Sequence, residues 1–158
     1  MSLEEKNRQQ KGRKLLTLLF WIYIAVLLKF TIFREAFSFD HLLQNGSLNL
    51  SLFTAYIPFL RGGFIWLFIY LFVGNIVWFI PLGGYLTWKY PNCSVWKVTA
   101  AGLSLSFVIE LSQFVFGVGV TELDDLVLNT AGTLIGAIFM RVWQRIAAKR
   151  LSAHEKEN

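Results

Sequence analysis

The chain has 158 residues, enough for one domain, and 55% of them are apolar against only 16% charged. Soluble domains have about 45–50% apolar and about 25% charged residues, so this composition excludes an ordinary soluble globule and favours an integral membrane protein. The net charge of +5 comes from basic residues at the termini and helix ends, which favours anionic lipid over nucleic acid as a partner.

The N-terminal third of the chain predicts one membrane span followed by a mixed segment. Residues 1–14 form a polar, basic tail that we expect in the cytoplasm. Residues 15–33 are an apolar run long enough to cross a hydrocarbon core about 30 Å thick. No small-x-small cleavage site follows the run, so we predict an uncleaved helix. Within residues 34–63, the apolar stretch 48–60 is too short to span, and we expect it to lie in the interface or to re-enter the membrane.

Three further apolar runs complete the predicted four-helix, all-α membrane protein. The second run covers residues 64–80 and ends at Pro81-Leu82-Gly83-Gly84, with a weaker continuation to an aromatic anchor at Trp88. The third span is expected at about 95–116 and the fourth at about 124–143. Residues 144–158 then form a basic tail, which we expect in the cytoplasm.

The distribution of Lys and Arg predicts the orientation. The N-terminal tail carries five, the 89–97 loop two, and the chain from Arg141 onward five. Residues 34–63 carry two, and the 117–123 loop carries none. Because basic residues accumulate on the cytoplasmic side, we expect both termini in the cytoplasm and the 117–123 loop outside.

Polar side chains inside the predicted spans indicate where a site could lie. At 1.5 Å rise per residue, Glu110 lies roughly 9 Å and Asn129 roughly 7 Å below the outer ends of their helices. Lys29 of the first span lies at a similar depth. Because a charge at a helix centre costs about 2.5–3.5 kcal/mol, we hypothesise a Lys29–Glu110 ion pair, or a neutral, hydrogen-bonded Glu110 if no cation reaches it.

Helical spacing groups these side chains further. Glu110 and Gln113 share a face of the third span, and a second stripe follows the fourth span, consisting of Asp125, Asn129, Gly132 and Gly136. Gly132 and Gly136 form a Gly-x-x-x-Gly pattern that allows close helix approach. We therefore predict an outward polar pocket of Glu110, Gln113, Asp125 and Asn129, floored by glycine packing. Glu110 or Asp125 would be the candidate general base.

Several residues near this pocket also have a structural interpretation. Thr121 and Asp124 fit a capping box, and Glu122 and Asp124 complement the helix dipole. Asn75 is expected to make a packing hydrogen bond, and Arg34 is either a snorkelling cation or an anion-binding group at the pocket mouth. We keep Asn75, Arg34 and Lys29 as candidate binding residues. Pro81, Gly83, Gly132 and Gly136 are interpreted as structural.

Other familiar sites are absent from the sequence. There is no Gly-rich phosphate loop, no CxxC and no HExxH, and a single cysteine excludes an internal disulfide. The predicted topology puts His41 and His154 on opposite sides of the membrane. We expect no metal and no cofactor; the oligomeric state is not predicted.

Three motifs in order resemble the VanZ-like membrane protein family. The pattern E-x-x-Q followed by D-D-x-x-x-N-x-x-G-x-x-x-G stands at Glu110 to Gly136, N-x-x-x-F-x-P-x-G at Asn75 to Gly83, and N-L-x-x-F-T at Asn49 to Thr54. Leu52 and Gly119 stand where many members carry Pro and Arg. The resemblance covers about residues 15–140, so we assign 15–143 as a VanZ-like four-helix membrane domain.

The resemblance implies a multi-pass protein of the bacterial cell membrane that lowers susceptibility to teicoplanin-type lipoglycopeptides. Its pocket would bind an envelope lipid, a lipid-linked wall precursor or the drug, and demonstrable catalysis is not expected. One alternative is a membrane-embedded enzyme acting on an envelope lipid with Glu110 or Asp125 as general base. A second is a structural or regulatory membrane subunit.

Overall fold

Four long apolar helices dominate the structure. The computed structural model describes residues 3–33, 37, 39–43 and 46–157. In this part of the chain four helices are long and apolar enough to cross a membrane: α1 (Leu3–Thr31), α3 (Ile65–Lys89), α4 (Val95–Phe116) and α5 (Leu123–Glu157). The prediction of an all-α protein with four membrane helices is confirmed in its main part: the structure is nearly all-α and has four helices long and apolar enough to cross a membrane.

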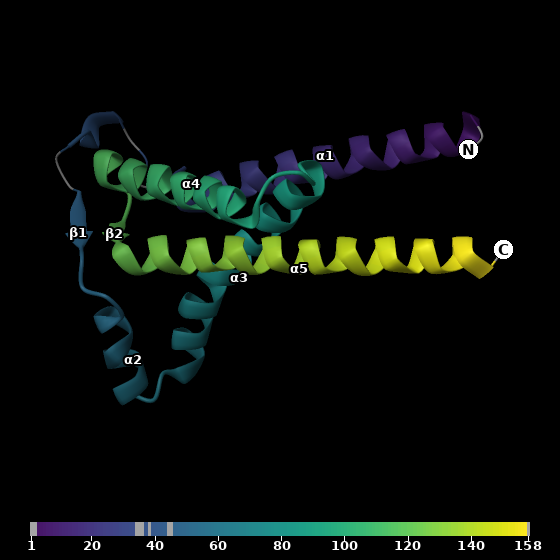
Figure 1. Ribbon diagram of the computed structural model, residues 1–158. Helices are drawn as coiled ribbons and strands as arrows, with labels where there is room; N and C mark the ends of the chain where they lie inside the picture. The colour runs from purple at the N-terminus through teal and green to yellow at the C-terminus, as the bar shows by residue number, and fades with distance from the viewer. Residues whose placement is uncertain (1–2, 34–36, 38, 44–45, 158) are drawn as a thin grey trace.

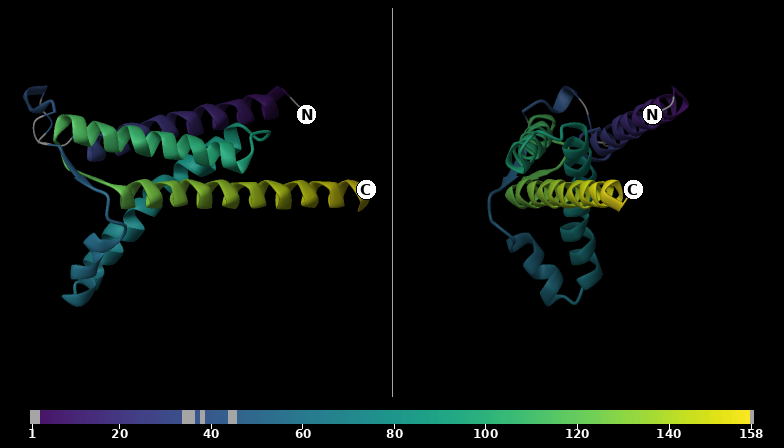
Figure 2. Two further views of the ribbon diagram at one scale, coloured as in Figure 1. Left: turned by 60° about the vertical axis from the view of Figure 1, so that its left-hand side comes forward. Right: turned by 45° about the vertical axis from the view of Figure 1, so that its right-hand side comes forward.

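The arrangement of these helices gives the molecule two distinct ends. α1, α4 and α5 run side by side, and α3 crosses them (Figures 1 and 2). The N-terminal end of α1 and the C-terminal end of α5 lie on the same side of the molecule, which we name the termini end (Figure 1). The opposite end carries the connections after α1 and α4, and we name it the ladder end. Which end faces the cytoplasm stays a prediction.

The ladder end contains a short parallel β-ladder that the sequence did not predict. Strand β1 (Ser47–Asn49) pairs with β2 (Val120–Glu122), with Ser47 opposite Val120 and Asn49 opposite Glu122. The two strands come from the connections after α1 and after α4. The ladder therefore fixes the long segment between α1 and α3 against the start of α5.

The rest of that segment forms short helical turns and a hairpin. Phe39–His41 is the 3₁₀ turn η1, Thr54–Tyr56 is the 3₁₀ turn η2, and Ile57–Arg61 is the helix α2. α2 and the start of α3 form a hairpin that projects away from the bundle (Figures 1 and 2). Its position relative to a membrane stays a prediction.

The predicted closure of the second span at Pro81 is wrong, whereas the predicted continuation of this element to Trp88 is confirmed. α3 continues through Pro81 to Lys89. Proline removes one backbone donor from a helix, but neighbouring helices can satisfy the turn that contains it. Here the hydroxyl of Tyr23 in α1 donates at 2.6 Å to the carbonyl of Trp78, which neighbours the Val77 carbonyl that lacks its usual donor at Pro81. Similarly, α5 extends past the predicted end at residue 143 to Glu157, and α1 already begins at Leu3.

Glycines set the crossing of α3 and α5. A Cβ added to Gly132 would overlap the carbonyl oxygen of Ile76, and one added to Gly136 would overlap that of Ile80. From the other side, a Cβ on Gly83 would overlap the carbonyl oxygen of Thr133. The two backbones thus pack directly against each other, the arrangement that small residues permit in membrane helices. The neighbouring apolar core joins α1, α3 and α4 through Leu27, Phe79, Leu82 and Ile109.

Candidate functional site

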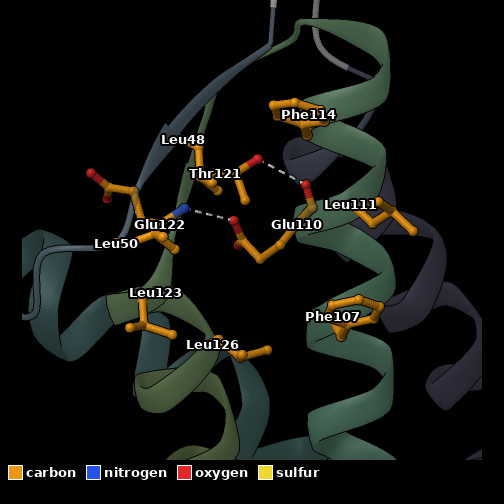
Figure 3. A pocket seen from close by; sticks show the side chains of 10 residues that line it. All are labelled: Leu48, Leu50, Phe107, Glu110, Leu111, Phe114, Thr121, Glu122, Leu123 and Leu126. Atoms are coloured by element: carbon orange, nitrogen blue, oxygen red, sulfur yellow. Dashed lines mark hydrogen bonds between the residues drawn. The ribbon is translucent and has the colours of Figure 1, made fainter. Parts of the chain in front are cut away.

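Glu110 is a buried carboxylate fixed to the ladder. It lies near the end of α4 and is only 5% exposed. Its Oε2 accepts a hydrogen bond from the backbone N–H of Glu122 at 3.0 Å, and its backbone carbonyl accepts one from the hydroxyl of Thr121 at 2.9 Å (Figure 3). Both partners belong to β2. A buried carboxyl group needs hydrogen-bond partners, so the ladder fixes the position of this side chain.

An apolar cavity of about 290 Å³ lies between this part of α4, the ladder and the first turns of α5. Leucine and phenylalanine dominate its wall, whose apolar members are Leu48, Leu50, Phe107, Leu111, Phe114, Leu123 and Leu126 (Figure 3). Glu110, Thr121 and Glu122 complete the lining. Phe107 and Leu111 are 56% and 48% exposed on α4, so the cavity opens to the side of a membrane helix. The predicted pocket was polar, whereas this cavity is mainly apolar with one buried acid in its wall.

Asp124 connects the start of α5 to the segment after β1. Its Oδ1 accepts the backbone N–H of Phe53 at 2.7 Å, and Phe53 has the left-handed backbone conformation, with φ of 58°. Beside it, the side-chain amide of Asn49 donates to Glu122 Oε1 at 3.4 Å. The N-L-x-x-F-T and D-D motifs therefore meet in space.

The capping-box interpretation of Thr121 and Asp124 is not what the structure shows. α5 begins at Leu123, so Glu122 occupies the position before the helix and Thr121 lies in β2. The hydroxyl of Thr121 donates to the carbonyl of Glu110, and Asp124 accepts from Phe53. The ladder takes the residues that a local cap would have used, because pairing with β1 extends the chain up to Glu122.

Asp125 faces α3 in a second polar group. Its Oδ1 accepts a hydrogen bond from the side-chain amide of Asn75. The buried side chain of Tyr56 lies in the same group, beside Asn75. Burial raises the pKa of the Tyr56 phenol above its ordinary value, and the carboxylates of Asp125, Asp124 and Glu122 raise it further. Tyr56 carried no signal in the sequence that distinguished it from other aromatic residues.

Gln113 and Asn129 face different helices. Gln113, 4% exposed, donates to the carbonyl of Thr31 in α1 at 3.2 Å. Asn129, 6% exposed, donates to the hydroxyl of Ser106 in α4 at 2.9 Å. Ser106 was missed, although it stands four residues before Glu110 on the same helical face and that spacing could have revealed it. The four predicted pocket residues thus belong to separate contacts with α1, α3, α4 and β2.

Of the two cations predicted near the pocket, Lys29 and Arg34, the structure describes only Lys29. The ammonium of Lys29 donates to the backbone carbonyl of Phe33 at 2.8 Å, so the structure places it at the end of its own helix rather than on Glu110. Arg34 lies outside the described residues. Within the described part of the chain, no group of three or more His, Cys, Asp or Glu side chains could hold a metal ion.

The arrangement can bind an apolar chain beside an acid and can hold that acid in one orientation. Glu110 and Asp125 both accept hydrogen bonds from fixed donors, which orients their carboxylates toward the ladder and toward α3 respectively. The apolar cavity adjoins Glu110 and not Asp125.

Known proteins match the chain over the whole of this region. The sequence profile of the VanZ/LLP1 family matches residues 20–144, which include the ladder, the cavity and both polar groups. Protein VanZ of Enterococcus faecium is 28% identical over 117 residues, corresponding to 73% of this chain and 66% of that relative. The match therefore spans slightly less than two thirds of the relative's length. No solved structure matches the chain.

Proposed function

The chain belongs to the VanZ/LLP1 family, and from this membership we propose that it is a multi-pass protein of the bacterial cell membrane that lowers susceptibility to teicoplanin-type lipoglycopeptides. In this proposal the ladder end faces the outside of the cell, where such drugs act. The cavity beside Glu110 takes an acyl-bearing molecule: an envelope lipid, a lipid-linked wall precursor or the drug.

The observation that carries the proposal is the composition and position of the cavity. Its wall is mainly Leu and Phe, and it opens between exposed apolar side chains of a membrane helix. A hydrocarbon chain can enter from the bilayer without leaving an apolar environment. Glu110 and the polar edge of the ladder then lie beside the less apolar part of the same molecule. A site of this kind, apolar with a few placed polar groups, is typical of ligand pockets.

Filling the cavity tests this use of it. Leu111→Trp puts a larger ring on the wall, and Leu103→Trp is the matched control, because Leu103 is similarly exposed on α4 but does not line the cavity. Both variants would be produced in a susceptible bacterial host, with their membrane abundance measured beside the inhibitory concentration of an acylated glycopeptide. We expect Leu111→Trp to remove most of the protection, at least fourfold, and Leu103→Trp to keep it. Equal protection by the two variants at equal abundance would reject the cavity as the binding site.

The charge of Glu110 is tested separately with Glu110→Gln. The amide oxygen of Gln can still accept the Glu122 N–H, so the fold is expected to persist while the negative charge is lost. Loss of protection at normal abundance would contradict a purely structural role for Glu110. Turnover of an envelope lipid by the purified protein, lost in this variant, would instead support the enzymatic alternative.

A further inference from the structure

Two adjoining cavities lie at the termini end, opposite the cavity beside Glu110. The first, of about 300 Å³, lies between α1, α3 and α5, with Leu16, Tyr85, Phe139 and Met140 in its wall. The second, of about 240 Å³, is lined by Arg13, Trp88, Lys89 and Pro91. Trp88 lines both cavities, so the apolar one and the polar one adjoin at this side chain.

Two glycines contribute to the floor of the apolar cavity. Gly84 of α3 and Gly136 of α5 both line it. A Cβ added to Gly84 would meet only the carbonyl oxygen of Gly136, at 3.8 Å, so a side chain there would project without a backbone clash. Exposed Leu16 and Phe139, 46% and 66% accessible, form its sides. The resulting groove is apolar and opens toward the membrane.

The polar cavity combines two cations with an aromatic side chain. Arg13 and Lys89 are both exposed, and its described lining contains no acid. α1 and α3 are held together just below, where the hydroxyl of Tyr85 donates to Thr17 Oγ1 at 3.2 Å and the rings of Phe20 and Tyr85 stack at 3.8 Å. These contacts fix the helices that carry Arg13 and Lys89 side by side. The polar cavity thus offers two positive charges above an apolar groove.

We propose that this pair of cavities binds one anionic phospholipid, with an acyl chain in the groove and the phosphate between Arg13 and Lys89. Trp is enriched where membrane helices meet the headgroup region, and Trp88 stands at the boundary between the two cavities. Lys and Arg at this level attract anionic lipid. The site is separate from the cavity assigned to the resistance function, so the two proposals stand or fall independently.

Lipid retention by the purified full-length protein tests the headgroup half of the site. The detergent-solubilised protein is incubated with equal amounts of phosphatidylglycerol and phosphatidylcholine that carry identical acyl chains, and bound lipid is counted by native mass spectrometry. We expect phosphatidylglycerol to exceed phosphatidylcholine at least fivefold. Arg13→Gln/Lys89→Gln should bring the ratio close to one. Lys97→Gln/Lys149→Gln should leave it unchanged, because these exposed cations line neither cavity.

Two further experiments test the groove that would hold the acyl chain and the identity of the bound anion. Gly84→Leu fills the groove and should reduce retention of both lipids at least fivefold. Gly74→Leu, on the same helix with no atom near its Cβ, should not. Inorganic phosphate at the lipid concentration should not displace phosphatidylglycerol, because the acyl chain also holds the lipid. Equal binding of the two lipids by the wild type, unchanged binding in Gly84→Leu, or displacement by phosphate would each overturn the proposal.

Discussion

Asp124 connects two motifs that lie far apart in the sequence. The side chain is 1% exposed, and one of its oxygens accepts the N–H of Phe53, 71 residues away. The other oxygen is buried and has no hydrogen-bond partner in the described part of the chain. Asp124 therefore acts as the acceptor for the backbone amide of Phe53, a residue in the left-handed conformation.

Substitutions of Asp124 should distinguish the contributions that these two oxygens make to stability. Asp124→Ala leaves the Phe53 N–H unpaired, and we expect it to lower the free energy of unfolding by about 1–3 kcal/mol. Asp124→Asn keeps one acceptor oxygen and should remain closer to the wild type. Thermal unfolding in detergent measures both, and an Ala variant as stable as the wild type would show that this hydrogen bond is dispensable.

Tyr56 should make the stability depend on alkaline pH. Its pKa in the folded protein is raised above the ordinary value of 10.0, mainly by burial and then by nearby carboxylates. A raised pKa contributes stability that is fully present below pH 10.0 and is lost as pH rises past it. We expect the unfolding temperature of the wild type to fall more steeply between pH 9 and 11.5 than that of Tyr56→Phe. Parallel curves for the two proteins would contradict this assignment.

At the level of helices, the contact of α3 with α5 depends on glycine. Gly132→Ala would drive a methyl group into the carbonyl of Ile76, and the two helices would have to separate. We expect a loss of about 1–3 kcal/mol, the usual cost of overpacking, measured by thermal unfolding in detergent.

Gly74→Ala provides the control for this change. An added Cβ at Gly74 meets nothing, so the substitution should be neutral or slightly stabilising, since alanine favours the helix over glycine. If both alanine variants unfolded at the wild-type temperature, the close approach of α3 and α5 would not contribute to stability.

The helices were predictable where their ends are marked locally. α4 matches the prediction because Ser94 caps its start, accepting the N–H of Lys97, and Gly117 adopts the left-handed conformation at its end. A continuation to Trp88 was predicted, but an unbroken helix through Pro81 was not, since it involves packing against α1 and α5. The ladder has strands of only three residues, too short to leave a period in the sequence.

The sequence analysis selected individual polar residues but did not predict how they are arranged. Helical spacing identified Glu110 and Asp125, whereas their partners come from β2 and α3. Depth within the membrane placed Glu110 and Asn129 at a similar level, but their side chains hydrogen-bond to Glu122 and Ser106 respectively. Depth and spacing do not define which neighbour a helix face meets, and that information depends on packing between distant segments.

At the scale of the whole molecule, the proposed orientation can be measured by cysteine labelling. Cys93 lies in the loop between α3 and α4, at the termini end, and exposed Ser51 lies at the ladder end. In intact cells a membrane-impermeant maleimide should label Ser51→Cys in a Cys93→Ser background. It should label native Cys93 only after permeabilisation. The reverse pattern would invert the topology and move the cavity beside Glu110 to the cytoplasmic side.

The parallel ladder also governs the order of events during biosynthesis. Asn49 and Glu122 are 73 residues apart, and two membrane helices lie between them. At about 5–20 residues per second, translation of that interval takes roughly 4–15 seconds, during which β1 has no partner. The donors for Glu110 and one wall of its cavity arrive only with β2 and α5. Under the proposed function, a nascent chain with three inserted helices therefore lacks the complete cavity, and it could bind a ligand there only after the last helix enters the bilayer.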